Sequence, residues 1–352
     1  MSDLTWGLLI ATKDRLDALL VCIRLAVTQT HPPTEVVVVD SSANWEMHAR
    51  RIADLMASYP NIRLVYEKGA APSLTVQRNQ AIDEAQADIV FMIDDDSFMF
   101  PDCAAEIMAV YSADIEGEVA GIQAILSPEI PQAANFAQNR RKTPQASVNG
   151  ARSNKLMLWL KREVFLMTKD RLFIPYDDTE RSETVPGPLS NQDVALAPLF
   201  HGCRMTFRRH NITQTRFDGL LRYYCPGEDL DASYRLARTG LLLTAHRALL
   251  YHYNVTTGRI DRYKTTILSA LNQAVLLARH ATDKSLAKKR YWALMRRRMI
   301  AEVLKDGLSG RLSFPQLRGL LAARPLARKA FALGQDNLED WYMKVQDGIV
   351  KR

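Results

Sequence analysis

The stretch VFMIDDDSFMFPD, residues 90–102, decides the fold. Its first four residues are typical of a buried strand, and three carboxylates follow at once, Asp94, Asp95 and Asp96. Neighbouring carboxylates repel one another and resist desolvation, so a buried strand that ends in three of them needs a cation or several hydrogen-bond donors. Hard cations such as Mg²⁺ bind one or two carboxylates together with water and phosphate oxygens. The alternative is a solvated acidic turn before a helix that begins near Pro101.

The composition is that of a globular protein whose charge is unevenly distributed. The chain has 352 residues, of which 47% are hydrophobic and 24% charged, enough for one large domain or two modest ones. Residues 259–352 hold 20 Lys and Arg and 8 Asp and Glu, a balance of +12, so the total of +7 leaves −5 for residues 1–258. We therefore expect an acidic body followed by a basic C-terminal region.

Several features predict a cytoplasmic protein. The N-terminus lacks the basic residues and the apolar run of a signal peptide. No stretch approaches the ~18 apolar residues of a membrane span. The cysteines have neither a paired nor a metal-binding spacing, which favours free thiols in a reducing compartment; they are Cys22, Cys103, Cys203 and Cys225.

Strand and helix signals alternate through residues 4–128. The hydrophobic pattern predicts strands at 4–11, 35–40, 62–66, 88–93 and 119–124, and helices at 16–27, 44–58, 73–85 and 101–113, the first capped by Asp14. Such alternation is typical of a parallel sheet with helices on both faces. Ligands of these sheets bind beyond the carboxyl ends of the strands, where Asp40 and the three aspartates are expected.

The rest of the chain contains an irregular stretch, a second strand-bearing part and a helical tail. Seven prolines interrupt residues 127–200, in which a helix is expected at 153–168 and a loop at 179–191. Strands are predicted at 201–209, 241–245 and 248–253, with a helix at 223–240. Beyond residue 259 the pattern predicts helices at 262–280 and 286–305 and shorter ones to about 347.

Five side chains outside the aspartate run could take part in chemistry, and each has a purely structural alternative. Asp40 could accept a hydrogen bond from a nucleobase or cap a helix. Arg78 could bind a diphosphate or lie at the surface. Glu228 and Asp229 open a helix, where the helix dipole stabilises acidic residues, but Asp229 could also act as a general base. His252 could bind a metal through a neutral imidazole or pack beside tyrosines.

The basic C-terminal region has three interpretations. It could be a solvated helical face, a patch that docks on anionic lipid through Lys and Arg with Trp and Tyr at the interface, or a nucleic-acid surface. No nucleic-acid-binding motif accompanies the cations, and the aspartate run would repel a phosphate backbone, so we expect no nucleic-acid partner. A peripheral position at the inner face of the cytoplasmic membrane stays open.

The order of the motifs resembles that of the inverting family-two glycosyltransferases of the GT-A fold. IATKDR (10–15), EVVVVDSS (35–42) and LTVQRNQAIDEAQADIVFMIDDD (74–96) resemble the family's first loop, its base-binding strand and its run from Arg-Asn to the DxD motif. GCRMTFRR (202–209), FDGLL (217–221) and GEDLDASYRLARTG (227–240) resemble its acceptor-side strand and ED helix. The resemblance covers residues 4–128 and 200–255. The chain departs from the family's pattern at Ala11, Lys13, Asp14 and Gln80.

The resemblance implies a role for each matching residue. Asp96 and His252 would bind Mn²⁺ or Mg²⁺, and Asp229 would be the catalytic base. Gly202 and Glu228 would lie on the acceptor side. The nucleotide and its diphosphate would be held by Thr12, Arg15, Asp40, Arg78, Asp94 and Asp95.

The resemblance also implies a fold and a function. Residues 1–258 would form one α/β domain with a mostly parallel sheet, divided into a nucleotide-sugar-binding half (1–128) and an acceptor-side half (129–258), and 259–352 a basic helical region. The activity would be metal-dependent, inverting sugar transfer from a nucleotide-diphosphate donor to a glycan or lipid-linked acceptor, in surface polysaccharide or glycolipid synthesis. One alternative is a non-catalytic module that binds sugar nucleotides or glycans. Another is a nucleotidyltransferase, but residues 8–20 lack the glycines of its phosphate loop.

Overall fold

The chain divides into two units, each with its own elements. Unit 1 comprises Met1–Val148, Ser182–Gly219 and Glu228–Gly258, and unit 2 comprises Asn149–Arg181, Leu220–Gly227 and Arg259–Arg352. The computed structural model describes residues 4–134, 159, 172–177, 184–223, 225–255, 260–308, 310 and 312–351. The helix expected at 153–168 therefore lies outside the described residues, apart from residue 159.

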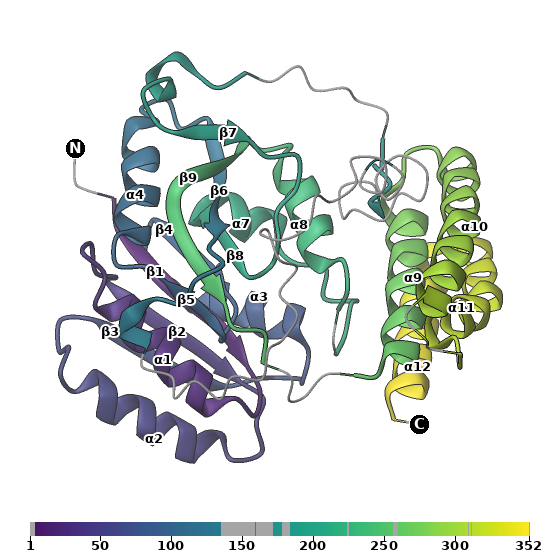
Figure 1. Cartoon of the computed structure of the whole chain (residues 1–352), viewed down its shortest axis with the longest axis horizontal. Coiled ribbons are helices and arrows are strands. Elements are labelled where there is room, and N and C mark those ends of the chain that lie inside the picture. The colour runs from purple at the N-terminus through teal and green to yellow at the C-terminus, as the bar shows by residue number, and fades with distance from the viewer. Residues whose placement is uncertain are drawn as a thin grey trace. The chain divides into compact units, whose positions relative to one another are not determined.

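Unit 1 is built on one nine-stranded sheet (Figure 1). The strand order is β3-β2-β1-β4-β8-β6-β9-β5, and β7 pairs with β9. Six strands run in one direction, and β5, β7 and β8 run against them, so the predicted mostly parallel sheet is confirmed. The bounds are β1 Trp6–Thr12, β2 Glu35–Asp40, β3 Arg63–Lys68, β4 Ile89–Ile93, β5 Ser97–Met99, β6 Val119–Leu126, β7 Val194–Leu196, β8 Arg204–Arg208 and β9 Leu241–His252.

Helices cover both faces of this sheet. Successive residues of a strand point to opposite faces. Leu8 and Phe91 therefore pack in one core with residues of α1, α2 and α4, whereas Leu9 and Val90 pack in another with residues of α3, α7 and α8. Both sides of the central strands are buried, which explains their continuous apolar runs. The helices are α1 Leu16–Val27, α2 Trp45–Met56, α3 Leu74–Glu84, α4 Cys103–Ala113, α7 Arg209–Thr215 and α8 Glu228–Leu236; short 3₁₀ turns cover Gln132–Ala134 and Gly187–Leu189.

Two local predictions are wrong. The expected strands at 241–245 and 248–253 are the single strand β9, which pairs with β6 across a register shift between Gln123 and Ile125. Asp14 does not cap α1, because Arg15 occupies the N-cap position. Asp14 instead has a left-handed φ of 55°, and its amide donates to Ser42 Oγ at 2.6 Å. Aspartate adopts this backbone conformation more readily than most residues.

Unit 2 is helical in its described part, which confirms the predicted helical C-terminal region. The helices are α9 Arg262–His280, α10 Lys284–Leu308, α11 Pro315–Ala332 and α12 Gln335–Val350. The carboxylate of Asp261 caps α9 by accepting from the Lys264 amide at 2.9 Å. Within the described residues, none of the helices combines the length and the hydropathy needed to span a membrane. The four cysteines are free, as expected, and all four are buried.

A buried glutamine of α12 holds the segment 220–227 within unit 2. The Gln346 side chain donates to the Leu220 carbonyl oxygen at 2.9 Å and accepts from the Arg222 amide at 2.8 Å. Gln346 is 0% exposed, so water cannot readily replace it as the partner of these two backbone groups.

Replacing this glutamine is expected to destabilise the protein. Gln346→Ala would remove both of these buried hydrogen bonds to the backbone and lower the free energy of unfolding by about 2–4 kcal/mol. Urea unfolding followed by circular dichroism measures this loss. Lys344→Ala changes an exposed residue of the same helix and should stay within about 0.5 kcal/mol of the unmodified protein. Equal stabilities of the two variants would show that the bonds of Gln346 contribute nothing.

Candidate functional site

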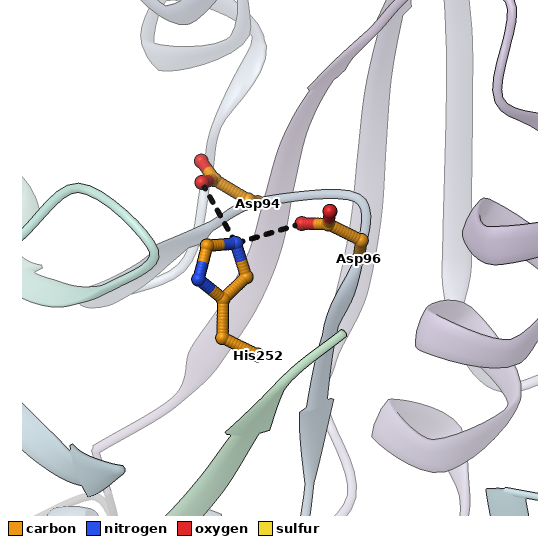
Figure 2. Close-up of side chains that lie close together, drawn as sticks. All are labelled: Asp94, Asp96 and His252. Carbon is orange, nitrogen blue, oxygen red and sulfur yellow. Dashed lines mark hydrogen bonds and ion pairs between the residues drawn. The ribbon is translucent and has the colours of Figure 1, made fainter. Parts of the chain in front are cut away.

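Two carboxylates and an imidazole meet where β4 and β9 end (Figure 2). Asp94 and Asp96 follow β4, and His252 is the last residue of β9. The His252 Nε2 atom lies 3.1 Å from Asp96 Oδ1 and 3.8 Å from Asp94 Oδ2. Figure 2 shows this one ring nitrogen facing both carboxylates. The three ligand-type atoms all lie within 4.8 Å of one another.

This spacing fits a divalent cation. Oxygen and nitrogen ligands of Mg²⁺ and similar ions lie about 2.0–2.2 Å from the metal, so ligands at right angles are about 3 Å apart. The pair His252–Asp96 already has this separation, and the Asp94 side chain, 31% exposed, has room to rotate toward it. Two carboxylates with one imidazole suit Mn²⁺ or Mg²⁺. The two predicted ligands are thus brought together, and the structure places Asp94 beside them.

The pairing of β5 with β9 brings His252 to the aspartates. Ser97 is the register partner of His252, and the Tyr253 amide donates to the Asp96 carbonyl oxygen at 2.9 Å. Burial alone would lower the pKa of His252, but its hydrogen bond with Asp96 raises this pKa to about 10. Burial likewise opposes ionisation of Asp96, yet His252 and the amide of Val255 keep the pKa of this carboxyl below its usual value.

Asp95 has partners of its own at the end of β1. Its oxygens accept from Thr12 Oγ1 at 2.7 Å and from Arg15 Nη1 at 3.1 Å. The same Arg15 nitrogen lies 3.8 Å from Asp96 Oδ2. Burial raises the pKa of Asp95 to about 7, even though the charge of Arg15 opposes this shift. Both predicted residues of the first loop, Thr12 and Arg15, therefore lie at the aspartate run.

The guanidinium of Arg78 connects the aspartates to the start of α8. Its nitrogens lie 3.0 Å from Asp94 Oδ1, 3.0 Å from Glu228 Oε1 and 3.1 Å from the Gly202 carbonyl oxygen. The Gly202 amide in turn donates to Asp229 Oδ2 at 3.0 Å. A Cβ atom on Gly202 would lie 3.2 Å from Glu228 Oε1 and 3.4 Å from Arg78 Nη2, so any other residue here would crowd both side chains. Arg78 is 3% exposed, so the surface alternative for this residue is wrong.

Three carboxyl groups share the single charge of Arg78. They belong to Asp94, Glu228 and Asp229. Burial and the neighbouring Asp229 raise the pKa of Glu228 to about 8, and the attraction of Arg78 only partly offsets them. The raised pKa favours the protonated form of Glu228, and a proton on this carboxyl reduces the repulsion within the group.

Asp40 lies at the same edge of the sheet, because it is the register partner of Thr12. It is fully buried, and both of its oxygens have protein partners. One accepts from the Ser42 amide at 2.7 Å, and the other contacts His48 Nδ1 at 2.8 Å and the Tyr66 hydroxyl at 2.7 Å. Its contact with a nucleobase stays a prediction, as do the individual roles assigned to the other site residues.

Sequence reasoning missed Gln77, which precedes Arg78 on α3. Its side-chain amide donates to the Thr12 and Val39 carbonyl oxygens, both at 2.8 Å, and so joins the ends of β1 and β2. Gln77 is 4% exposed. The sequence did hold a signal for Gln77. It is a polar residue on the side of α3 that faces the sheet, and this helix begins close to the ends of β1 and β2. His48 and Tyr66, the partners of Asp40, carried no such signal.

Comparison with known proteins gives a family match for the first part of the chain. Residues 8–143 match the family model described as glycosyl transferase family 2. This range contains Thr12, Asp40, Arg78 and the aspartate run, and it ends before Gly202. No curated protein matches the chain by sequence.

Several solved structures are similar. GalNAc-T7 with UDP, GalNAc and Mn²⁺ is 14% identical with a TM-score of 0.52, and the match covers 78% of this chain and 48% of that one. The present chain thus spans about half the length of GalNAc-T7. The mannosyltransferase PcManGT from Pyrobaculum calidifontis, in complex with GDP-Man and Mn²⁺, is 15% identical with a TM-score of 0.49. The match covers 92% of this chain and 87% of the PcManGT chain. S. aureus TarS 1-349 is 14% identical with a TM-score of 0.48, and the match covers 98% of this chain and 92% of the TarS chain. The first of these likenesses shows the expected GT-A fold.

Metal binding is expected to depend on the cluster at the ends of β4 and β9. Mn²⁺ should raise the melting temperature, because an ion at a hundredfold excess over its Kd stabilises the folded state by about 2.7 kcal/mol. Asp96→Asn and His252→Gln should each remove most of this shift in a thermal-shift assay. Asp54→Asn, at an exposed carboxylate of α2, should retain it. A full shift in Asp96→Asn would exclude this residue as a ligand.

Glu228 is expected to make stability depend on pH. The pKa of Glu228 is about 8 in the folded state and about 4.5 in its ordinary, solvated state. Its contribution to stability is therefore fully present below about pH 4.5 and is lost as the pH rises through 8. The slope reaches at most ~1.4 kcal/mol per pH unit. Glu228→Gln should therefore gain stability relative to the unmodified protein as the pH rises from about 4.5 to 8 in urea unfolding. Parallel pH profiles of the two proteins would contradict the raised pKa.

Proposed function

We infer from the match of residues 8–143 that the chain belongs to glycosyl transferase family 2 and is a nucleotide-sugar glycosyltransferase of the GT-A fold. We propose that it is metal-dependent and inverting, and that it transfers a sugar from a nucleoside-diphosphate donor to a hydroxyl of a glycan or lipid-linked acceptor, in surface polysaccharide or glycolipid synthesis. One observation carries the proposal. Asp94 and Asp229 are joined through Arg78 and Gly202 by contacts of 3.0–3.1 Å, so the metal-ligand cluster and a candidate base belong to one site.

The donor side of the site combines carboxylates with cationic side chains. Asp94, Asp96 and His252 would hold the divalent ion. When bound, this ion acts as a Lewis acid that neutralises the charge developing on the leaving diphosphate. Arg78, whose guanidinium nitrogens bind Asp94, Glu228 and the Gly202 carbonyl oxygen, would contribute positive charge close to the diphosphate. The UDP and Mn²⁺ bound to GalNAc-T7 support this donor class for the fold.

The nucleotide would lie along the carboxyl ends of β1 and β2. Thr12 and Arg15 are at the end of β1, where Arg15 contacts Asp95 and lies near Asp96. Asp40 ends β2 and, from its register position beside Thr12, would face the base. These assignments follow the motif resemblance and the placement of all three residues at the ligand-binding edge of the sheet.

Asp229 is the better candidate for the base on the acceptor side. Its two oxygens accept from the Gly202 amide at 3.0 Å and from the Leu230 amide at 2.9 Å, which orients the carboxylate. The raised pKa of Glu228 favours its protonated form, and a carboxyl that already carries a proton cannot take one from the acceptor hydroxyl. Asp229 would remove the proton of an acceptor hydroxyl that attacks the sugar opposite the leaving group. Attack from that side inverts the configuration at C1.

The proposal predicts loss of transfer without loss of donor binding in Asp229→Asn. Removing a general base lowers the rate by about 10²–10⁴-fold. Transfer from labelled nucleotide sugars in the presence of Mn²⁺ measures this effect, and NMR of the product gives the anomeric configuration. Glu46→Gln, at an exposed carboxylate of α2, serves as the matched control.

Three outcomes would contradict parts of this proposal. Full activity of Asp229→Asn would exclude the assigned base, and retention of configuration would exclude the inverting mechanism. Donor binding without any transfer or donor hydrolysis in Mn²⁺ would favour the non-catalytic binding module.

A further inference from the structure

Helix α10 of unit 2 exposes charges of only one sign. Eight of its residues are Lys or Arg, and its two acidic residues, Glu302 and Asp306, are only 3% and 0% exposed. Arg298 is also buried, at 9%. The remaining cations are exposed: Lys284, Lys288, Lys289, Arg290, Arg296, Arg297 and Lys305. Because both acidic residues of α10 are buried, the exposed surface of this helix carries only positive charge.

The C-terminal half of the same helix exposes apolar side chains. Ile300, Val303 and Leu304 are 58%, 40% and 47% exposed, and their spacing places them on one helical face. Leu312, just beyond the helix, is 77% exposed. Single exposed apolar residues are common, but a cluster with helical spacing is typical of an interaction surface.

The cations and the apolar cluster share this face. At 3.6 residues per turn, Lys289, Arg290, Arg296 and Arg297 all project within about 80° of the direction of Ile300. Lys284 and Lys288 project more than about 100° away from it. One face of α10 is therefore basic in its N-terminal half and apolar in its C-terminal half. We call it the α10 face; its residues are Lys289, Arg290, Arg296, Arg297, Ile300, Val303 and Leu304.

We propose that the α10 face docks on a bilayer surface that contains anionic lipid. The cations would lie against the headgroups, and the three apolar side chains would enter the boundary between headgroups and acyl chains. A bilayer offers negative charge and apolar surface together, which matches both halves of the face. The proposal does not depend on the sugar-transfer reaction, because none of these residues belongs to the candidate site.

Two other occupants fit the α10 face less well. Antiparallel packing against a second copy would bury the cations of one chain against the apolar half of the other, without counter-charges. A nucleic-acid backbone would satisfy the cations but would leave Ile300, Val303 and Leu304 without an apolar partner. Charge and apolarity together therefore select the lipid surface.

The test is flotation of the full chain with vesicles of phosphatidylcholine, with and without phosphatidylglycerol. Binding is expected only with the anionic lipid and should weaken as salt is added. Each cation near the surface contributes about 1 kcal/mol, or about fivefold, so Lys289→Gln combined with Arg296→Gln should weaken binding by about 25-fold. Ile300→Ser combined with Leu304→Ser should weaken it by about tenfold or more.

A matched pair of substitutions separates the face from net charge. Lys284→Gln combined with Lys288→Gln removes the same charge from the same helix but away from the α10 face, and it should weaken binding by less than about threefold. Circular dichroism and the Mn²⁺ thermal shift verify that all variants fold.

Four results would overturn the proposal. Two of them concern the vesicles: equal binding to neutral vesicles, or no binding to anionic ones. The other two concern the variants: an equal loss of binding in the Lys289→Gln, Arg296→Gln variant and the Lys284→Gln, Lys288→Gln variant, or undiminished binding of the Ile300→Ser, Leu304→Ser variant. Self-association in sedimentation velocity that this last variant abolishes, with no vesicle binding, would assign the face to a second copy of the chain.

Discussion

The buried guanidinium of Arg78 is the contact on which the candidate site depends. It lies between Asp94 and Glu228 at 3.0 Å from each, and it also binds the Gly202 carbonyl oxygen. Without this charge, the carboxyl groups of Asp94, Glu228 and Asp229 would lie close together without the guanidinium that offsets their mutual repulsion. Removing one partner of a buried ion pair is strongly destabilising, because it leaves an uncompensated charge. One arginine thus permits the acidic site within unit 1.

The three consecutive aspartates coexist because each has different partners. Asp95 is held by Thr12 and Arg15 from the end of β1, Asp96 contacts His252 at the end of β9, and Asp94 contacts Arg78 of α3. The repulsion that makes this stretch conspicuous in the sequence is therefore offset by groups from distant segments. The same arrangement leaves Asp94 and Asp96 beside one imidazole nitrogen, where a cation can bind.

Much of the fold could be predicted because burial leaves a local pattern. The run EVVVVD predicted β2 with the bounds that the structure shows. The periodicity at 262–280 likewise predicted both ends of α9. Errors arose where tertiary pairing overrides the local pattern. The pattern predicted two strands, at 241–245 and 248–253, yet β9 continues through both with a register shift in its pairing with β6. The three-residue strand β5 is too short to show any periodicity.

By itself, the sequence determined that carboxylates end a buried strand and that a basic helical region follows, and it predicted that a ligand binds at this edge of the sheet. Only the tertiary structure decided which groups meet there. The register of β5 with β9 brings His252 to Asp96, and the packing of α3 buries Arg78 and Gln77 against the strand ends. Likewise, only packing decided that Glu302 and Asp306 are buried while Ile300 is exposed. The physical reason is that periodicity reports how a segment is buried, whereas a contact between distant segments depends on how they pair.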